Sequence, residues 1–144
     1  MKKKLIISVF GVITIVVILF FMWPLSFANV FNETADDAEM LILITIPFSD
    51  SEEYSFLADS EVFMQIQGIL SNYSYRRSFR TLFGDSSMRG NDAGYWVHFY
   101  LGERSIITGG TNEILVNASV YRLWPWGNSS NIKMMNEVRG VLVN

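Results

Sequence analysis

The chain has 144 residues, enough for one packed domain, and half of them are apolar, which excludes general disorder. Three of its 11 basic residues precede the apolar N-terminal run, which leaves eight against 14 acidic residues, a formal charge of −6, and excludes nucleic acid as an expected partner because phosphate binding rests on Lys and Arg. Cysteine is absent, so disulfides, thiolate metal sites and cysteine nucleophiles are excluded.

The N-terminal segment has the pattern of a membrane anchor. Three lysines at 2–4 precede an apolar run over residues 5–23, which as a helix would extend about 28 Å, close to the thickness of the bilayer hydrocarbon core. The positive-inside rule keeps the lysines in the cytoplasm and the rest of the chain outside. We predict a single-pass cell-membrane protein; the alternative is a signal peptide cleaved after Ala28, which would release a secreted domain.

This prediction divides the chain into three parts. Residues 1–28 are the anchor or signal peptide, residues 29–39 an acidic spacer, and residues 40–144 an extracytoplasmic domain. The domain opens on a dense apolar run at 40–46, bounded by Pro47, which predicts a buried strand. Residues 50–54 are expected to form a turn or loop.

The next segment predicts an amphipathic helix. Asp59 or Ser60 can cap it, Glu61 suits its positive first turn, and Ser71-Asn72 ends it. Its apolar residues recur at helical spacing and form one stripe. The stripe consists of Val62, Phe63, Ile66, Ile69 and Leu70.

Strands follow, and a second helix closes the chain. Alternation predicts strands over residues 77–83, 95–101, 105–108 and 113–124, separated by glycine-containing turns. Ser129 or Ser130 can cap the last helix. The order β-α-β-β-β-β-α predicts an α+β fold, with a single antiparallel sheet of four to five strands and two helices packed on one face.

A basic cluster stands out in the domain, formed by Arg76, Arg77 and Arg80. On an edge strand such residues deter sheet-to-sheet aggregation, which is the simplest interpretation. The alternative is contact with an anion or an acidic partner. Arg77 and Arg80 would point to opposite faces of a regular strand, so one ligand would not engage all three.

Aromatic residues flank the Pro125 break after the last strand. Tyr121, Trp124 and Trp126 would close one end of the core under the last helix, anchor a protein partner, or rest against the membrane interface. His98, the single histidine, shares a strand face with Trp96 and Tyr100. Alone it cannot form a multi-histidine metal site, and no serine or acid has triad spacing, so a packing or surface role is favoured.

The remaining motif searches are negative. The acidic residues Asp50, Glu52 and Glu53 lack the ligand pattern and central glycine of a calcium loop. The glycine-containing segment 84–90 is not followed by the Gly-Lys-Ser/Thr of a phosphate-binding loop. We therefore predict no catalytic residue, no metal site and no cofactor.

The layout resembles the small exported proteins of unknown function found in Gram-positive bacteria. The likeness rests on the lysine-led anchor, Ile-Thr-Ile-Pro-Phe-Ser-Asp at 44–50, Ile-Leu-Ser-Asn at 69–72 and the Tyr-Trp-Val-His-Phe strand at 95–99. It covers about 100 residues in pattern only, and it implies no chemistry for this chain.

The predicted function is a non-enzymatic binding or regulatory module that acts on a protein partner at the cell envelope. The residues expected to contact the partner are Arg76, Arg77, Arg80, Trp124 and Trp126. Two alternatives stay open. One is an enzyme for cell-wall or lipid material with paired acids in a cleft, at least one of them with a raised pKa. The other is a small-ligand pocket lined by His98, Trp96 and Tyr100.

Overall fold

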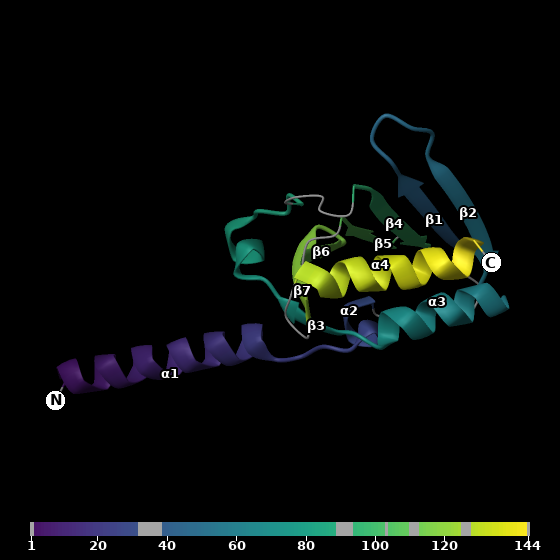
Figure 1. The fold of residues 1–144 in the computed structure, drawn as a ribbon. Coiled ribbons are helices and arrows are strands. Elements are labelled where there is room, and N and C mark those ends of the chain that lie inside the picture. Colours follow the sequence, from purple (N-terminus) through teal and green to yellow (C-terminus); the bar gives the residue numbers. More distant parts are fainter. Residues whose placement is uncertain are drawn as a thin grey trace.

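The computed structural model describes residues 2–31, 39–88, 94–102, 104–109, 113–124 and 128–143. Over these ranges the chain forms four α-helices, one 3₁₀ helix and seven strands (Figure 1). In chain order they are α1 (Lys2–Met22), α2 (Phe27–Phe31), β1 (Glu39–Thr45), β2 (Glu52–Leu57), α3 (Glu61–Ser71), β3 (Ser74–Arg77), η1 (Phe79–Phe83), β4 (Trp96–Leu101), β5 (Arg104–Thr108), β6 (Glu113–Val116), β7 (Ser119–Trp124) and α4 (Asn128–Val143).

The seven strands make one antiparallel sheet in the order β2-β1-β4-β5-β6-β7-β3. Sequential hairpins account for β1–β2 and for the run from β4 to β7. Two pairings are non-local: β1 pairs with β4 inside the sheet, and β3 adds to β7 at one edge. The α-helix α3 lies between β2 and β3 in sequence, so the chain crosses the whole sheet while it forms this helix.

The core lies between one face of the sheet and the helices α2, α3 and α4 (Figure 1). Alternation in the central strands decides which side chains face it: Ile42 of β1 pairs with Phe99 of β4, and both are buried. The helix α3 begins where Ser60 Oγ accepts a hydrogen bond from the Phe63 N–H at 3.2 Å. Ile66 of α3 and Met135 of α4 are fully buried against the sheet, so the predicted stripe of α3 is confirmed.

The predicted fold class is wrong in its details, although the α+β class and the antiparallel sheet agree with the structure. Seven strands replace the predicted four to five within the part of the chain that the structure describes. After the N-terminal helix α1, three α-helices (α2, α3 and α4) replace the predicted two. The strand β2 falls largely where a turn or loop was expected over residues 50–54. Its sequence is half polar because it lies at the edge of the sheet, so its apolar signal is weak.

The predicted long strand over residues 113–124 is instead a hairpin of β6 and β7. Asn117 and Ala118 both adopt positive φ, at 46° and 65°, which is the conformation of a tight hairpin turn. Asn117 also accepts a hydrogen bond from the Ser105 N–H through its side-chain oxygen, at 2.9 Å. Alanine is rare at positive φ, which explains why the sequence gives no turn signal at this point.

The predicted strand over residues 77–83 is a second correction. Only Ser74–Arg77 pairs with β7, and the chain then turns into the 3₁₀ helix η1. Ser78 Oγ caps η1 by accepting from the Arg80 N–H at 3.4 Å, and Gly84 ends it at a φ of 68°. The apparent alternation over these residues therefore reflects two short elements and not one strand.

The folded core begins before the predicted domain boundary at residue 40. Phe27 and Phe31 of α2 are 2% and 1% exposed, and their rings stack at 5.1 Å. Just before α2, Leu25 forms a two-way backbone bridge with Tyr75 on the outer side of β3, at 2.8 and 2.9 Å. Cleavage after Ala28 would remove one of the two stacked rings from the core.

The predicted membrane anchor and membrane localisation are not supported by the structure. In the described part of the chain, no helix is both long enough and apolar enough to cross a bilayer. The last turn of α1 also belongs to the domain, because Phe21 is 6% exposed and stacks on Phe79 at 4.3 Å.

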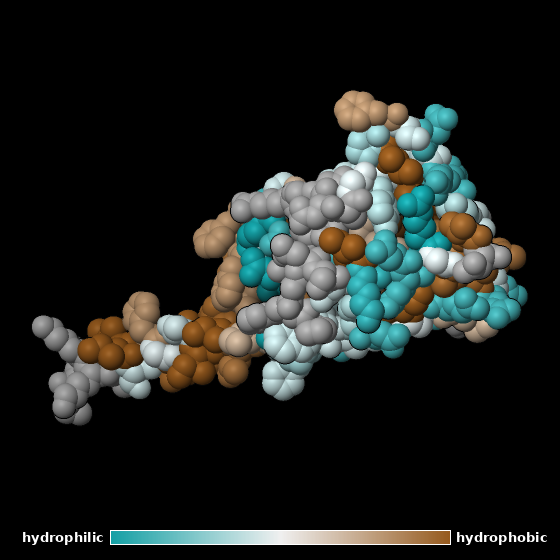
Figure 2. Space-filling model, in the orientation of Figure 1, coloured by the Kyte–Doolittle hydropathy of each residue, from teal (hydrophilic) through white to brown (hydrophobic). Residues whose placement is uncertain are grey.

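The other described side chains of α1, at residues 6–20 and 22, lie at the surface. Figure 2 shows a hydrophobic surface along this helix, whereas the visible face of the domain carries both hydrophilic and hydrophobic patches. The large apolar side chains between Ile6 and Leu19 are 39% to 71% exposed. Among the contacts of the described residues, α1 packs mainly against β3, at its own C-terminal end.

Close packing of Trp96 on Gly109 gives a test of the fold. A Cβ at Gly109 would lie 2.2 Å from the Trp96 ring, so Gly109→Ala forces the indole out of its position. We expect a loss of about 2 kcal/mol in the free energy of unfolding, measured by chemical denaturation. The control is Gly68→Ala in α3, where nothing lies within 4 Å, and which should gain about 0.5 kcal/mol. Equal effects of the two changes would contradict the packing described.

Candidate functional site

The structure separates the three clustered arginines. Arg76 and Arg77 lie on β3, at the edge of the sheet, and point to opposite faces because they are adjacent in a strand. The Arg76 guanidinium lies 4.3 Å from the ring centroid of Trp124, while that of Arg77 lies 4.2 Å from the ring centroid of Phe20. β3 lies at the edge of the sheet, as the interpretation of edge protection requires, but Leu25 already pairs with its outer side at Tyr75.

Arg80 has a different environment, because η1 directs it back toward the sheet. Its guanidinium binds the Glu113 carboxylate, and its Nε donates to Asp85 at 3.0 Å. The side chains of Arg80 and Glu113 are 13% and 8% exposed. Arg122 approaches the second oxygen of Glu113 at 3.3 Å. Arg80 is therefore mostly used inside the domain and presents little surface to a partner.

The same arginine holds the start of the loop after η1. Arg80 donates to the Ser87 carbonyl oxygen at 2.7 Å, and Asp85 accepts from the Ser87 hydroxyl at 2.6 Å. The hydrogen bond from Ser87, followed by that from Arg80, lowers the pKa of the Asp85 carboxyl below its usual range. The arrangement is a structural clamp, and it keeps Asp85 ionised at neutral pH.

Of the two tryptophans in the predicted partner site, only Trp124 lies among the described residues. Trp124 ends β7, is 40% exposed and carries Arg76 over its ring. Trp126 lies outside the described residues. Tyr121, also on β7, packs at the margin of the core. Contact between Arg76, Arg77, Arg80, Trp124 or Trp126 and a partner stays a prediction.

His98 lies at the centre of the sheet, on the face opposite the helices. It shares this face of β4 with Trp96 and Tyr100, and its ring stacks on Tyr100 at a centroid distance of 6.3 Å. Its Nδ1 atom is buried and has no hydrogen-bond partner among the described residues. Burial lowers the pKa of His98, which favours the neutral ring at physiological pH. A packing role, as predicted, fits this environment.

The tip of the β1–β2 hairpin is a candidate that sequence analysis missed. The Ser49 N–H donates to the Ile46 carbonyl oxygen at 3.2 Å and closes a tight turn with Pro47 and Phe48 at its centre. Phe48 has a φ of 64° and is fully exposed, with a relative exposure of 109%. This pattern, proline followed by a residue at positive φ, is that of a type II turn, where glycine is usual. The sequence signal that could have indicated this site is the pair Pro47-Phe48, which directly follows an apolar strand.

Position and charge distinguish this tip from the rest of the surface. The hairpin loop projects from the sheet on the side away from the N-terminus of α1 (Figure 1). Two acidic residues follow Phe48 and are exposed, Asp50 and Glu53. A third, Glu52, contacts Arg139 of α4 at 3.7 Å. The tip therefore combines one aromatic ring with negative charge.

Comparisons of the chain with protein-family models, with curated proteins and with solved structures found no match. The resemblance to small exported proteins of Gram-positive bacteria therefore stays a prediction. The function has to be argued from the geometry of this chain alone.

The buried carboxylate gives a stability prediction. Glu113→Gln would remove one of the two carboxylates that pair with the largely buried Arg80 guanidinium and leave Asp85 as the other, so we expect a loss of about 2 kcal/mol in the free energy of unfolding. The matched control, Glu52→Gln, weakens an exposed pair with Arg139 and should cost less than about 1 kcal/mol. Urea denaturation of both variants measures the difference. A Glu113 variant as stable as the control would contradict a stabilising role for the Arg80–Glu113 pair.

His98 predicts a pH dependence of stability. Its pKa in the folded chain lies below the unfolded value of 6.5, so the unfolded state binds the proton first as the pH falls. The free energy of unfolding should therefore decrease from about pH 6.5 downward until the folded pKa is passed. Denaturation at pH 7.5 and at pH 5.0 should show a smaller loss for His98→Gln than for the wild type. Equal losses would mean that His98 titrates normally.

Proposed function

We propose that this chain is a non-enzymatic module that binds a protein partner through the tip of its β1–β2 hairpin, with Phe48 as the anchor. The observation that carries the proposal is the combination of full exposure and positive φ at Phe48. Neither property helps the isolated domain fold. Both are explained by a partner that covers the ring.

The energetics of the isolated chain disfavour a phenylalanine at this position. A residue with a Cβ costs about 1–2 kcal/mol in the left-handed region, which glycine adopts freely. The exposed ring also forgoes about 1.5–3 kcal/mol that its burial would contribute. Strain of this kind is typical of functional sites, and buried aromatic anchors dominate the energetics of many protein interfaces.

The charges around the anchor define the chemistry of the partner. Asp50 and Glu53 are exposed beside Phe48, and residues 46–53 include no basic residue. A complementary surface would offer an apolar cavity for the ring, surrounded by lysine or arginine side chains. The rim charges would set the association rate and its salt dependence, while the ring would supply most of the affinity.

The enzyme alternative has less support. It required two facing acids, one of them with a raised pKa. The carboxyl of Asp85 has its pKa shifted in the opposite direction, by hydrogen bonds that hold it ionised. The buried carboxylate of Glu113 is engaged by Arg80 and Arg122. These acids serve packing and loop attachment, which supports a binding role over a catalytic one.

Photocrosslinking from the tip tests the proposal. A benzoyl-phenylalanine in place of Phe48, in the full chain and in the cells that produce it, should give one discrete crosslinked protein with an apolar, basic-rimmed surface. The matched control places the same probe at Leu57, at the other end of β2, where the side chain is 66% exposed. We expect no discrete product from this control.

Replacement of the anchor separates binding from folding. Phe48→Gly should raise the free energy of unfolding by about 1 kcal/mol, because glycine relieves the positive φ. Added in excess, the wild-type chain should compete with the probe-bearing chain for the crosslinked partner. The Phe48→Gly chain should not compete. Asp50→Lys should slow association and leave stability within about 0.5 kcal/mol. The proposal fails if Phe48→Gly competes as well as the wild type, or if Leu57 yields the same product.

A further inference from the structure

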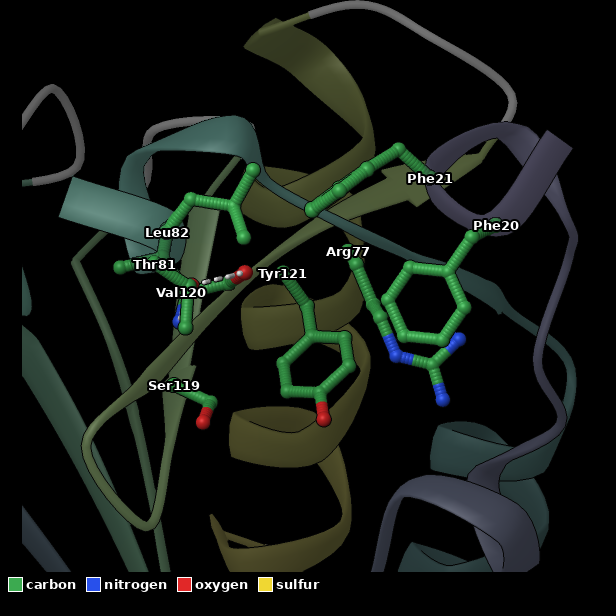
Figure 3. Close-up of a pocket in the computed structure, with 8 residues that line it drawn as sticks. All are labelled: Phe20, Phe21, Arg77, Thr81, Leu82, Ser119, Val120 and Tyr121. Carbon is green, nitrogen blue, oxygen red and sulfur yellow. Dashed lines mark hydrogen bonds between the residues drawn. The ribbon is translucent and has the colours of Figure 1, made fainter. Parts of the chain in front are cut away.

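A pocket of about 210 Å³ lies where the C-terminal end of α1 meets the rest of the domain. None of the residues that line it belongs to the β1–β2 hairpin. Four elements enclose it, namely the end of α1, the end of β3, the helix η1 and the start of β7 (Figure 3). Apolar side chains form most of its wall. The residues that line it are Phe20, Phe21, Arg77, Thr81, Leu82, Ser119, Val120 and Tyr121.

The wall of this pocket is formed by interactions within the chain. Thr81 of η1 accepts a hydrogen bond from the Val120 N–H at 3.0 Å and donates back to the Val120 carbonyl oxygen at 3.3 Å (Figure 3). On the opposite side, Phe21 stacks on Phe79 with an interplanar angle of 23°. Both η1 and α1 are thereby fixed against the sheet, so the pocket exists before any ligand binds.

Arg77 supplies the charge at this site. Its guanidinium lies over the Phe20 ring, and Figure 3 shows the two side chains together on one side of the pocket. Within the described residues, no carboxylate lies at ion-pair distance from Arg77, in contrast to the nearby Arg80. An arginine beside an apolar wall, without an internal counter-charge, can donate two parallel hydrogen bonds to a carboxylate.

We propose that this pocket binds a small amphiphilic carboxylate. Its aliphatic chain would pack against Phe21, Leu82 and Val120, and its carboxylate would pair with Arg77. The volume is smaller than the roughly 300–1,000 Å³ of drug-sized ligand sites, which limits the ligand to a short chain. This second binding site is independent of the protein-binding role proposed for Phe48.

Site-directed labelling of the full chain tests this inference. The probe is octanoate with a photoreactive diazirine on its chain, and the labelled peptides are identified by mass spectrometry. Label should appear in residues 77–82 and 119–121. Excess octanoate should remove it, whereas octanol, which has the same chain without the charge, should compete at least tenfold less well.

Two neighbouring arginines provide matched variants. Arg77→Gln removes the charge at the pocket and should reduce labelling at least tenfold, while Arg76→Gln, which alters the contact with Trp124 on the other face of the sheet, should leave it unchanged. Leu82→Trp keeps Arg77 and narrows the apolar space, so it should reduce labelling as well. Circular dichroism and thermal unfolding establish that each variant is folded.

Four results would overturn the inference. The first is labelling that maps elsewhere in the chain, and the second is equal competition by octanol and octanoate. The third is occupation of the pocket by the Phe48 tip of a second copy. It would appear as concentration-dependent association in analytical ultracentrifugation, lost in both Phe48→Gly and Leu82→Trp. A retained signal in Arg77→Gln together with a folded far-ultraviolet spectrum would equally refute the role of the charge.

Discussion

The pairing of β1 with β4 joins the two halves of this protein. The first part is the β1–β2 hairpin. The second part is the meander from β4 to β7, with β3 added at its edge. The contact is non-local, because β2, α3, β3 and η1 lie between the two strands in sequence. Its core-facing pairs, such as Ile42 with Phe99 and Ile44 with Val97, are almost completely buried. Without them the sheet would have no continuous face against which α3 and α4 could pack.

This architecture places the two proposed sites at different parts of the molecule. The β1–β2 hairpin forms one edge of the sheet and carries Phe48 in its loop. The strand β3 forms the opposite edge, and its Arg77 lines the pocket. The edge strand β3 is covered on its outer side by the bridge from Leu25. The short η1 then turns over β7 and is held there by Arg80 and Glu113. Packing among the described residues thus accounts for the pocket wall, but not for the exposed Phe48 ring or for the charge of Arg77 at the pocket.

Charge is used in two distinct ways in this chain. The largely buried carboxylate of Glu113 pairs with the largely buried Arg80 and with the half-exposed Arg122, and this contact joins η1 to β6 and β7. At Arg77 and at Asp50, by contrast, the described residues leave the charge facing outward, toward a pocket or toward solvent. The charges around Glu113 are paired with one another and stabilise the fold, whereas those of Arg77 and Asp50 can contact a binding partner or ligand.

Local sequence patterns were sufficient for some of this structure. The capping serine and apolar stripe of α3, the apolar strand β1, the aromatic strand β4 and the closing helix α4 could all be predicted, because helical and strand periodicity are encoded within ten or so residues. Tertiary structure decided the edge strand β2, the positive-φ turn at Asn117 and Ala118, and η1 in place of a strand. It also decided the engagement of Phe21 by the domain and the pairing of Arg80 with Glu113, 33 residues apart. These features depend on contacts with other segments of the chain. The periodic pattern of one segment carries no information about which other segment will pack against it.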